Sequence, residues 1–262
     1  MYETVRIERD DRGVATLWLD RAEKHNALSA RMIAELHAAA QTLGADESVR
    51  VVVMAAEGKT FCAGGDLGWM RDQFAADPET RAAEAGKLAY MLQALNTLPK
   101  PLIARVHGNA FGGGLGMISV CDVAVGADSV QMACTETRLG LIPATIGPYV
   151  AARTGEAKAR RFFMSGRRFD AAEAVRLDLL ARAVPQDALD QAIEEEVAPY
   201  LDCAPEAVSQ AKSLLRRLGP KIDTDVIGDT IEALSACWAG AEAQAGISAF
   251  FDKREPPWRG GD

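Results

Sequence analysis

The stretch AFGGGLGMISVCD, from Ala110 to Asp122, places three consecutive glycines before an apolar run that contains a fourth, Gly116. Glycine is a poor helix and strand former, so three in a row predict a special turn rather than the interior of an element. Strand-like residues precede these glycines, in PLIARVHGNA. We therefore predict a strand that ends in a glycine turn, from which a helix starts.

A second glycine turn lies earlier in the chain, in TFCAGGDL, from Thr60 to Leu67. A backbone without a Cβ atom lets a ligand approach closely, and a turn that opens into a helix directs N–H groups toward whatever binds there. Two such N–H groups from separate turns would form an oxyanion hole. The alternative is that both segments are ordinary tight turns where elements pack closely.

The first part of the chain alternates strand and helix patterns. GVATLWLD, from Gly13 to Asp20, and the β-branched run from Val49 to Gly58 predict strands. Between them, apolar residues at helical spacing predict a helix that is capped by Asn26 and stops at Gly44. A further helix is predicted from about Pro78 to Leu98.

The later part of the chain looks almost entirely helical. After a short strand in DVAVGAD and a helix start in ATIGPYVAARTG, further helix starts are predicted near Asp170, Pro185, Ala204 and Thr224. An α/β body followed by a helical C-terminal part fits this order.

Composition and charge exclude several classes of function. The formal net charge is −8 and there is no block of lysines and arginines, which disfavours a nucleic-acid or anionic-membrane partner. No run of residues is long and apolar enough for a membrane span, and the acidic start lacks a signal sequence, so we expect a cytoplasmic protein. Five widely spaced cysteines predict neither a disulfide framework nor a metal site.

Three familiar catalytic motifs are absent. EGKT, from Glu57 to Thr60, resembles the end of a phosphate-binding loop, but the first glycine of that motif would fall at Val53. A dinucleotide-binding motif that starts at Gly112 would end at Met117, which is not glycine. There is no G-x-S-x-G motif for a nucleophilic serine either.

Several motifs in order along the chain resemble the enoyl-CoA hydratase/isomerase (crotonase) family: RAEKHNAL, FCAGGDL, GNAFGGG, ETRLGLIP and AFFDKREPPW. The resemblance implies a spiral of repeated ββα units in residues 1–200, which would bind a CoA thioester. It also implies a helical region for trimerisation in residues 201–262. The expected assembly is a homotrimer or a dimer of trimers.

The same resemblance implies a site. The backbone N–H groups of Gly65 and Gly113 would form the oxyanion hole for the thioester oxygen and stabilise an enolate. The CoA would contact residues from three parts of the chain, namely Lys24, His25, Ala27, Ala63, Asp66, Leu67, Phe250 and Lys253. Alternatively, Lys24 and Lys253 are solvated lysines. CoA is part of the substrate, so no separate cofactor is expected.

Two glutamates carry the proton transfers in hydratases of this family. The second of them matches Glu136, just before LGLIP, whereas Gly116 stands at the position of the first. The difference predicts an enzyme that works with one matched glutamate. A glycine at residue 116 would also enlarge the pocket and remove a buried negative charge, which favours a bulky or acidic acyl group.

Three functions are compatible with these residues. RLGLIPATIGPYVAARTG resembles bacterial hydratases of branched, carboxylated enoyl-CoAs, of the methylglutaconyl or isohexenylglutaconyl type found in leucine and terpene breakdown. The first prediction is therefore addition of water across the 2,3 double bond of such a substrate. The second is a 3,2-enoyl-CoA isomerase that uses Glu136 alone. The third is a non-catalytic CoA-thioester binder or an RNA-associated protein, against which Glu136 and the acidic charge argue.

Overall fold

The computed structural model of the chain describes residues 2–259 and contains two β-sheets. The main sheet has six strands in the order β1-β2-β3-β5-β7-β10. Only β1 is antiparallel to its neighbour. The strands of this sheet are β1 (Val5–Arg9), β2 (Val14–Leu19), β3 (Val51–Ala56), β5 (Leu102–Val106), β7 (Val123–Ala127) and β10 (Arg182–Val184).

The second sheet has four short strands in the order β4-β6-β8-β9. They are β4 (Thr60–Cys62), β6 (Asn109–Phe111), β8 (Gln131–Ala133) and β9 (Phe169–Asp170). The pairs β3 and β4, β5 and β6, and β7 and β8 each place one strand in the main sheet and the next in the second sheet. The chain thus winds through repeated ββα turns, as predicted.

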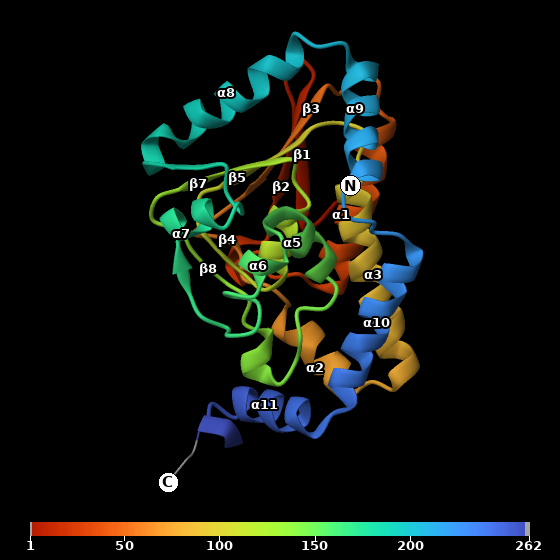
Figure 1. Cartoon of the computed structure of the whole chain (residues 1–262), viewed down its shortest axis with the longest axis vertical. Helices are drawn as coiled ribbons and strands as arrows, with labels where there is room; N and C mark the ends of the chain where they lie inside the picture. The colour runs from red at the N-terminus through yellow and green to blue at the C-terminus, as the bar shows by residue number, and fades with distance from the viewer. Residues whose placement is uncertain (1, 260–262) are drawn as a thin grey trace.

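Helices surround the two sheets. Figure 1 shows α8 on one side of the main sheet and α1 with α3 on the other. The α-helices are α1 (Ala30–Ala45), α2 (Leu67–Ala75), α3 (Pro78–Asn96), α4 (Gly113–Ser119), α5 (Gly147–Thr154), α6 (Glu156–Ala159), α7 (Ala171–Arg176), α8 (Leu189–Leu201), α9 (Pro205–Leu218), α10 (Thr224–Ala239) and α11 (Ala241–Phe251). Short 3₁₀ helices are η1 (Ala22–Lys24), η2 (Glu136–Leu139), η3 (Gln186–Ala188) and η4 (Pro257–Arg259). Within residues 2–259, every helix is too short or too polar to cross a lipid bilayer.

The core lies between the main sheet and its helices. All six residues of β3 are buried, as expected for a central parallel strand that is covered on both faces. The buried face of α1 repeats at helical spacing and includes Met32, Ile33 and Leu36. This periodicity is why the helix could be predicted from the sequence.

The predicted cap of α1 was wrong. Ser29 caps this helix, since its side chain accepts a hydrogen bond from the N–H of Met32. Asn26 instead holds loops together: it accepts from the N–H of Arg21 and donates to the carbonyl oxygens of Glu57 and Thr60. Its side chain is fully buried, so the apparent cap is a loop-fixing residue.

The C-terminal half contains two strands that the sequence did not indicate, and the predicted start of its helical region falls inside a helix. Asp170 does cap α7, and α9 and α10 begin one residue after Ala204 and at Thr224. However, β9 and β10 interrupt the stretch that was predicted to be almost entirely helical. The predicted boundary between residues 200 and 201 falls in the last turn of α8.

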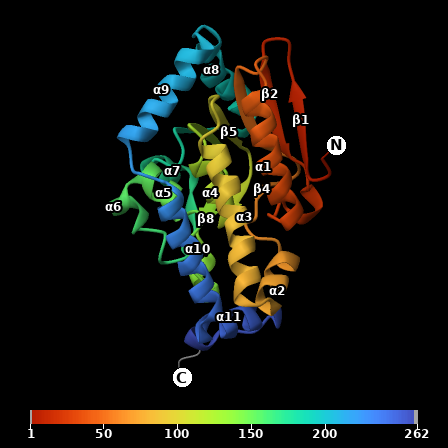
Figure 2. The same cartoon turned by 90° about the vertical axis from the view of Figure 1, so that its right-hand side faces the viewer.

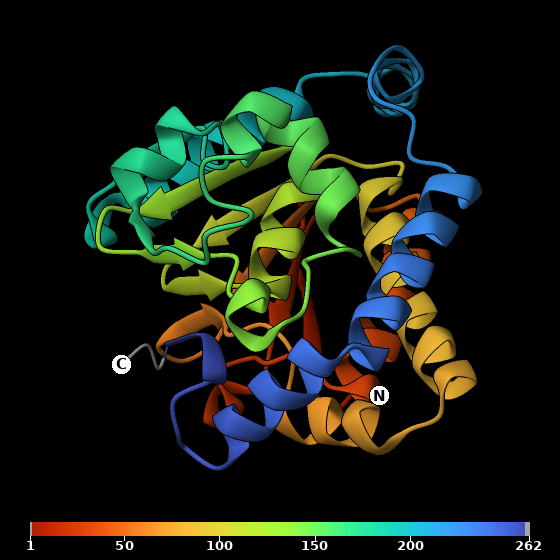
Figure 3. The same ribbon diagram turned by 60° about the horizontal axis from the view of Figure 1, so that its bottom comes forward.

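The last three long helices differ in how they contact the body. α10 packs on α3, and α11 packs against η2, as Figure 2 shows for the pair α10 and α3. By contrast, α9 has no buried residue, and Figure 3 shows it at the edge of the molecule. Leu215 and Leu218 on this helix are 70% and 75% exposed.

Candidate active site

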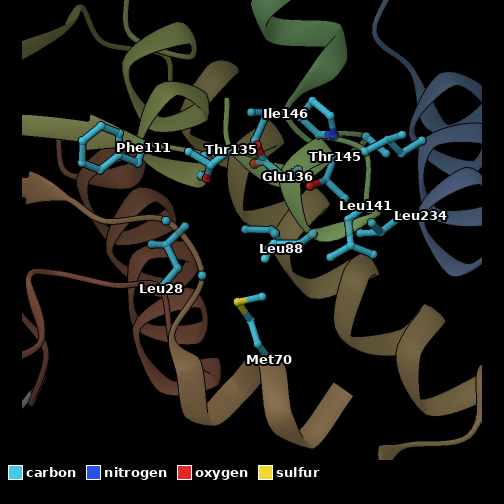
Figure 4. A pocket seen from close by; sticks show the side chains of 18 of the residues that line it. Leu28, Met70, Leu88, Phe111, Thr135, Glu136, Leu141, Thr145, Ile146 and Leu234 are labelled. Carbon is cyan, nitrogen blue, oxygen red and sulfur yellow. The ribbon is translucent and has the colours of Figure 1, made fainter. Parts of the chain in front are cut away.

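A cavity of about 470 Å³ lies beside the second sheet and is lined by both glycine turns. Figure 4 shows part of its lining, with Glu136 near the middle. The strands β4, β6 and β8 are parallel neighbours, so their carboxyl ends lie along one edge of the sheet. Gly65, Gly113 and Glu136 each follow one of these strands by two or three residues. The topology therefore brings the three predicted site residues together.

The first turn is fixed by hydrogen bonds to Leu28. The N–H of Leu28 donates to the oxygen of Gly64 (2.7 Å), and the N–H of Asp66 donates to the oxygen of Leu28 (3.1 Å). Since alternate residues of an extended segment face opposite sides, this pairing turns the N–H of Gly65 away from Leu28. Asp66 then caps α2 through the N–H groups of Gly68 and Trp69.

In the second turn, each of the three consecutive glycines avoids a different collision. A Cβ atom on Gly112 would lie 2.8 Å from Oε1 of Glu136, and Gly112 has φ of +49°. A Cβ on Gly113 would lie 2.7 Å from Cδ1 of Leu28, and one on Gly114 would lie 2.6 Å from the carbonyl oxygen of Cys62. The triplet is therefore required by the packing of the two turns and of Glu136.

Gly65 and Gly113 both line the cavity, and each has a backbone N–H group. Neither donates a hydrogen bond to any acceptor within residues 2–259. The two turns touch, since a Cβ on Gly113 would be 3.8 Å from the Cα of Gly64. Two unused donors at neighbouring turns can bind one oxygen atom of a ligand in the cavity.

Glu136 begins η2 and lines the cavity. Its backbone oxygen accepts from the N–H groups of Gly140 and Leu141, which fixes the turn that holds it. The residue as a whole is half-buried, but Oε2 is buried and has no hydrogen-bond partner in the described part of the chain. Burial raises the pKa of the carboxyl to about 7, against a smaller lowering by the N–H groups of Glu136 and Thr135. Near neutral pH the carboxyl can therefore accept and release a proton.

The expectation that Gly116 enlarges the pocket was wrong. A Cβ atom on Gly116 would lie 2.3 Å from Cγ2 of Ile146 and 3.6 Å from Cδ2 of Leu92. Ile146 is 2% exposed, so it fills the space next to Gly116 with a well-packed hydrocarbon side chain. The space beside Gly116 is thus filled by hydrocarbon rather than open.

The cavity has an apolar inner part and two cations among its lining residues. The inner part is formed by side chains of α2, α3, α10 and the loop after η2, namely Met70, Leu88, Leu141, Ala144, Ile146, Leu234 and Trp238. Arg138 and Arg168 also line the cavity, are exposed, and have no ion-pair partner within residues 2–259. The Arg168 guanidinium lies 5.3 Å from the centre of the Phe111 ring.

The residues predicted to contact CoA fall into two groups. Ala63, Leu67 and Phe250 line the cavity. The remainder, Lys24, His25, Ala27, Asp66 and Lys253, lie outside its lining. Two of these are tied to the first glycine turn. The backbone oxygen of His25 accepts a hydrogen bond from the N–H of Ala63 (3.0 Å), and the carboxylate of Asp66 accepts one from the guanidinium of Arg21 (2.7 Å).

The sequence placed residues 144–149 near the acyl chain but did not single out Thr145 or Ile146, which both line the cavity. Thr145 is only 5% exposed and lines the cavity, although its hydroxyl is polar. Both residues belong to the loop before α5. The sequence could have offered one signal, namely a threonine between apolar residues in LIPATIGPY.

Comparisons with known proteins agree with this fold. A family model described as enoyl-CoA hydratase/isomerase matches residues 9–261. The mouse (Mus musculus) mitochondrial methylglutaconyl-CoA hydratase is 30% identical over 264 residues, which cover 97% of this chain and 82% of the mouse protein.

Solved structures are similar over nearly the whole chain. An enoyl-CoA hydratase of Mycobacterium smegmatis is 36% identical, with a TM-score of 0.80, and the match covers 98% of this chain and 100% of that one. AtuE of Pseudomonas aeruginosa is 34% identical, with a TM-score of 0.79 and the same coverage.

Proposed function

Because this chain belongs to the enoyl-CoA hydratase/isomerase family, we infer that it adds water across the 2,3 double bond of an enoyl-CoA thioester. The observation that carries this inference is the position of Glu136. Its buried carboxyl, with a pKa of about 7, lies in the same cavity as the two unused N–H groups of Gly65 and Gly113. A base beside an oxyanion site is what addition to a conjugated thioester requires.

The oxyanion site would act on the thioester oxygen. When water attacks C3, the electron pair of the double bond moves toward the carbonyl and gives an enolate. The N–H groups of Gly65 and Gly113 would donate to that oxygen, and losing one such donor typically costs about 3–4 kcal/mol of barrier. No side chain is needed for this part of the site.

Glu136 would then carry out both proton transfers. Its carboxylate takes a proton from water as the oxygen bonds to C3, and the resulting acid returns that proton to C2 of the enolate. This sequence leaves Glu136 ionised again and needs no second carboxyl. The apolar contact of Ile146 with Gly116 is consistent with such a one-glutamate scheme.

The same single carboxyl could move a double bond from the 3,4 to the 2,3 position. In that reaction Glu136 removes a proton from C2 and returns it to C4, without water. We retain this isomerase as the second candidate because one buried carboxyl suffices for it.

A branched or carboxylated acyl group is our finer proposal. The inner part of the cavity is hydrocarbon, so it suits an apolar branch. Arg138 and Arg168 carry no ion-pair partner within residues 2–259 and would attract a carboxylate that reaches them. The similarity to a methylglutaconyl-CoA hydratase, whose name indicates a branched substrate, supports the same class.

CoA would lie outside the hydrocarbon part of the cavity. We propose that it passes Ala63, Leu67 and Phe250, which line the cavity, and reaches the turn of Lys24, His25 and Ala27. Asp66 would contribute through its backbone, because its carboxylate is already paired with Arg21. Lys253 remains a proposed contact next to the end of α11.

A homotrimer or a dimer of trimers is also proposed. The leucines of α9 form an apolar face that residues 2–259 leave exposed, and burying such a face is the usual driving force for assembly. Light scattering of the purified protein measures the number of chains directly. We further propose a cytoplasmic location, in keeping with buried free thiols at Cys62, Cys121 and Cys134.

The function is tested by incubating the purified protein with 3-methylglutaconyl-CoA, crotonyl-CoA and 3-hexenoyl-CoA. Hydration adds the mass of one water and removes the absorbance of the conjugated thioester. Conversion of 3-hexenoyl-CoA to 2-hexenoyl-CoA, with no water taken up by any of the three substrates, would replace the hydratase by the isomerase. Binding of CoA esters without any turnover would instead indicate a non-catalytic binder.

A further inference from the structure

Thr145 places a hydroxyl group in the hydrocarbon part of the cavity. It lies in the loop between η2 and α5, directly before Ile146, which packs on Gly116. Only 5% of the residue is exposed, but it lines the cavity, and its hydroxyl forms no hydrogen bond with residues 2–259. A hydroxyl at a cavity wall that has no partner in the protein is free to bind water or a ligand in that cavity.

The carboxyl of Glu136 is an unpaired polar group that belongs to the same cavity. Its Oε2 is buried and has no hydrogen-bond partner in the described part of the chain. Figure 4 shows the side chains of Glu136 and Thr145 pointing into the same cavity from neighbouring loops, with Ile146 and Leu141 beside them. A buried water molecule needs two to four polar partners, and these two side chains can supply them.

The geometry of water addition requires two acceptors. An attacking water directs one lone pair at C3, gives one O–H to the base, and needs an acceptor for its other O–H. Ile146 fills the space beside Gly116 and offers no acceptor. Thr145, the next residue along the chain, carries an oxygen at the wall of the same cavity.

We propose that Thr145 positions the attacking water together with Glu136, by accepting the second O–H of that water. The inference rests on the proposed hydratase function. In the reaction, the O–H bond of the water that points to Glu136 breaks and its proton passes to the carboxylate. The water oxygen bonds to C3, and Glu136 then delivers the proton to C2. Thr145 keeps its own proton throughout, so it is a positioning residue rather than an acid or a base.

The test compares Thr145→Val with Thr145→Ser. Valine has nearly the same shape but no hydroxyl, whereas serine keeps the hydroxyl and loses a methyl group. For the enoyl-CoA that the parent protein hydrates fastest, we expect Thr145→Val to lower kcat about 10- to 100-fold, which is the usual loss for one hydrogen bond to a charged or reacting group. KM should change less than about threefold, and Thr145→Ser should stay within about threefold of the parent in kcat.

Three outcomes separate the possibilities. A Thr145→Val protein that keeps its kcat, or a folded Thr145→Ser protein that loses activity equally, would overturn the role of Thr145 and leave the hydratase function standing. A parent protein that hydrates none of the enoyl-CoA substrates would remove the proposed function and this inference with it. Thermal unfolding of each variant shows whether a loss of rate has a structural cause.

Discussion

Cγ2 of Ile146 lies so close to Gly116 that a Cβ atom on residue 116 would be 2.3 Å away from it. Two residues that are distant in the sequence therefore share one packing site: α4 supplies the empty position and the loop before α5 supplies the side chain that fills it. The pair explains why a glycine at residue 116 leaves no hole in the core.

Gly116→Ala should destabilise the fold by about 1–3 kcal/mol, because the new methyl group collides with Ile146. Ile146→Ala alone should cost about 2–5 kcal/mol through the cavity that it leaves. The double variant should lose about 0.5–3 kcal/mol less of its unfolding free energy than the sum of the two single losses. Urea unfolding of the four proteins measures this coupling, and strictly additive losses would contradict the contact.

Glu136→Gln should abolish catalysis while the protein still binds substrate. The amide keeps the shape of the side chain but cannot take a proton, and losing a general base typically lowers kcat by a factor of about 10²–10⁴. Calorimetric titration with a CoA ester should give an affinity close to that of the parent. Full activity in this variant would exclude every catalytic role assigned to Glu136.

The pH dependence of kcat/KM should follow the ionisation of Glu136. The base must be deprotonated to accept a proton from water, and burial raises the pKa of this carboxyl to about 7. The rate should therefore rise with pH and level off above about pH 7. A rate that is already maximal at pH 5 would mean that Glu136 keeps an ordinary carboxyl pKa.

The same carboxyl should make stability depend on pH. The folded-state pKa of about 7 lies above the ordinary value of 4.5, so the stability linked to this proton is full below pH 4.5 and is lost as pH rises through 7. Glu136→Gln avoids that loss, which amounts to roughly 3 kcal/mol at full extent. Unfolding at pH 5 and pH 8 should show that the substitution benefits stability more at pH 8. An equal effect at both pH values would argue against a buried ionisable carboxyl.

Gly112→Ala should disturb the carboxyl of Glu136 directly. The added methyl group would lie 2.8 Å from Oε1 of Glu136, on a residue whose φ is +49°. We expect a large loss of kcat together with about 1–3 kcal/mol of destabilisation. Gly228→Ala is the matched control. No atom lies within 4 Å of its added Cβ, and alanine has a higher helix propensity than glycine at this position inside α10. Equal activities in the two variants would contradict the contact of Gly112 with Glu136.

The sequence predicted those elements whose local pattern matches their final burial. The run Val51–Ala56 forms a buried strand because short β-branched runs suit a covered parallel sheet. By contrast, β10 has only half-buried residues, and its pairing with β7 is a contact between distant parts of the chain. Asn26 has the residue type of a cap, but the tertiary structure uses its amide to tie loops together.

For the candidate site, the motifs predicted the strand ends at which Gly65, Gly113 and Glu136 come together, and each of these residues lines the cavity. Their roles in catalysis stay predictions. The sequence could not indicate what occupies the space beside Gly116, because that depends on how the loop before α5 packs on α4. Because the position of Thr145 depends on the same loop packing, the sequence did not single out this residue either.

The parallel order of β4, β6 and β8 has a consequence for how such a protein can change its substrate. Hydrogen-bonded strands keep a spacing of about 4.8 Å, so the donors after β4 and β6 and the carboxyl after β8 are held at nearly fixed separations. The acyl chain of the proposed substrate would instead meet side chains of α2, α3 and α10, which are free to vary in size without moving the strands. Substitutions in those helices should therefore alter which thioester is accepted while the reacting geometry stays the same.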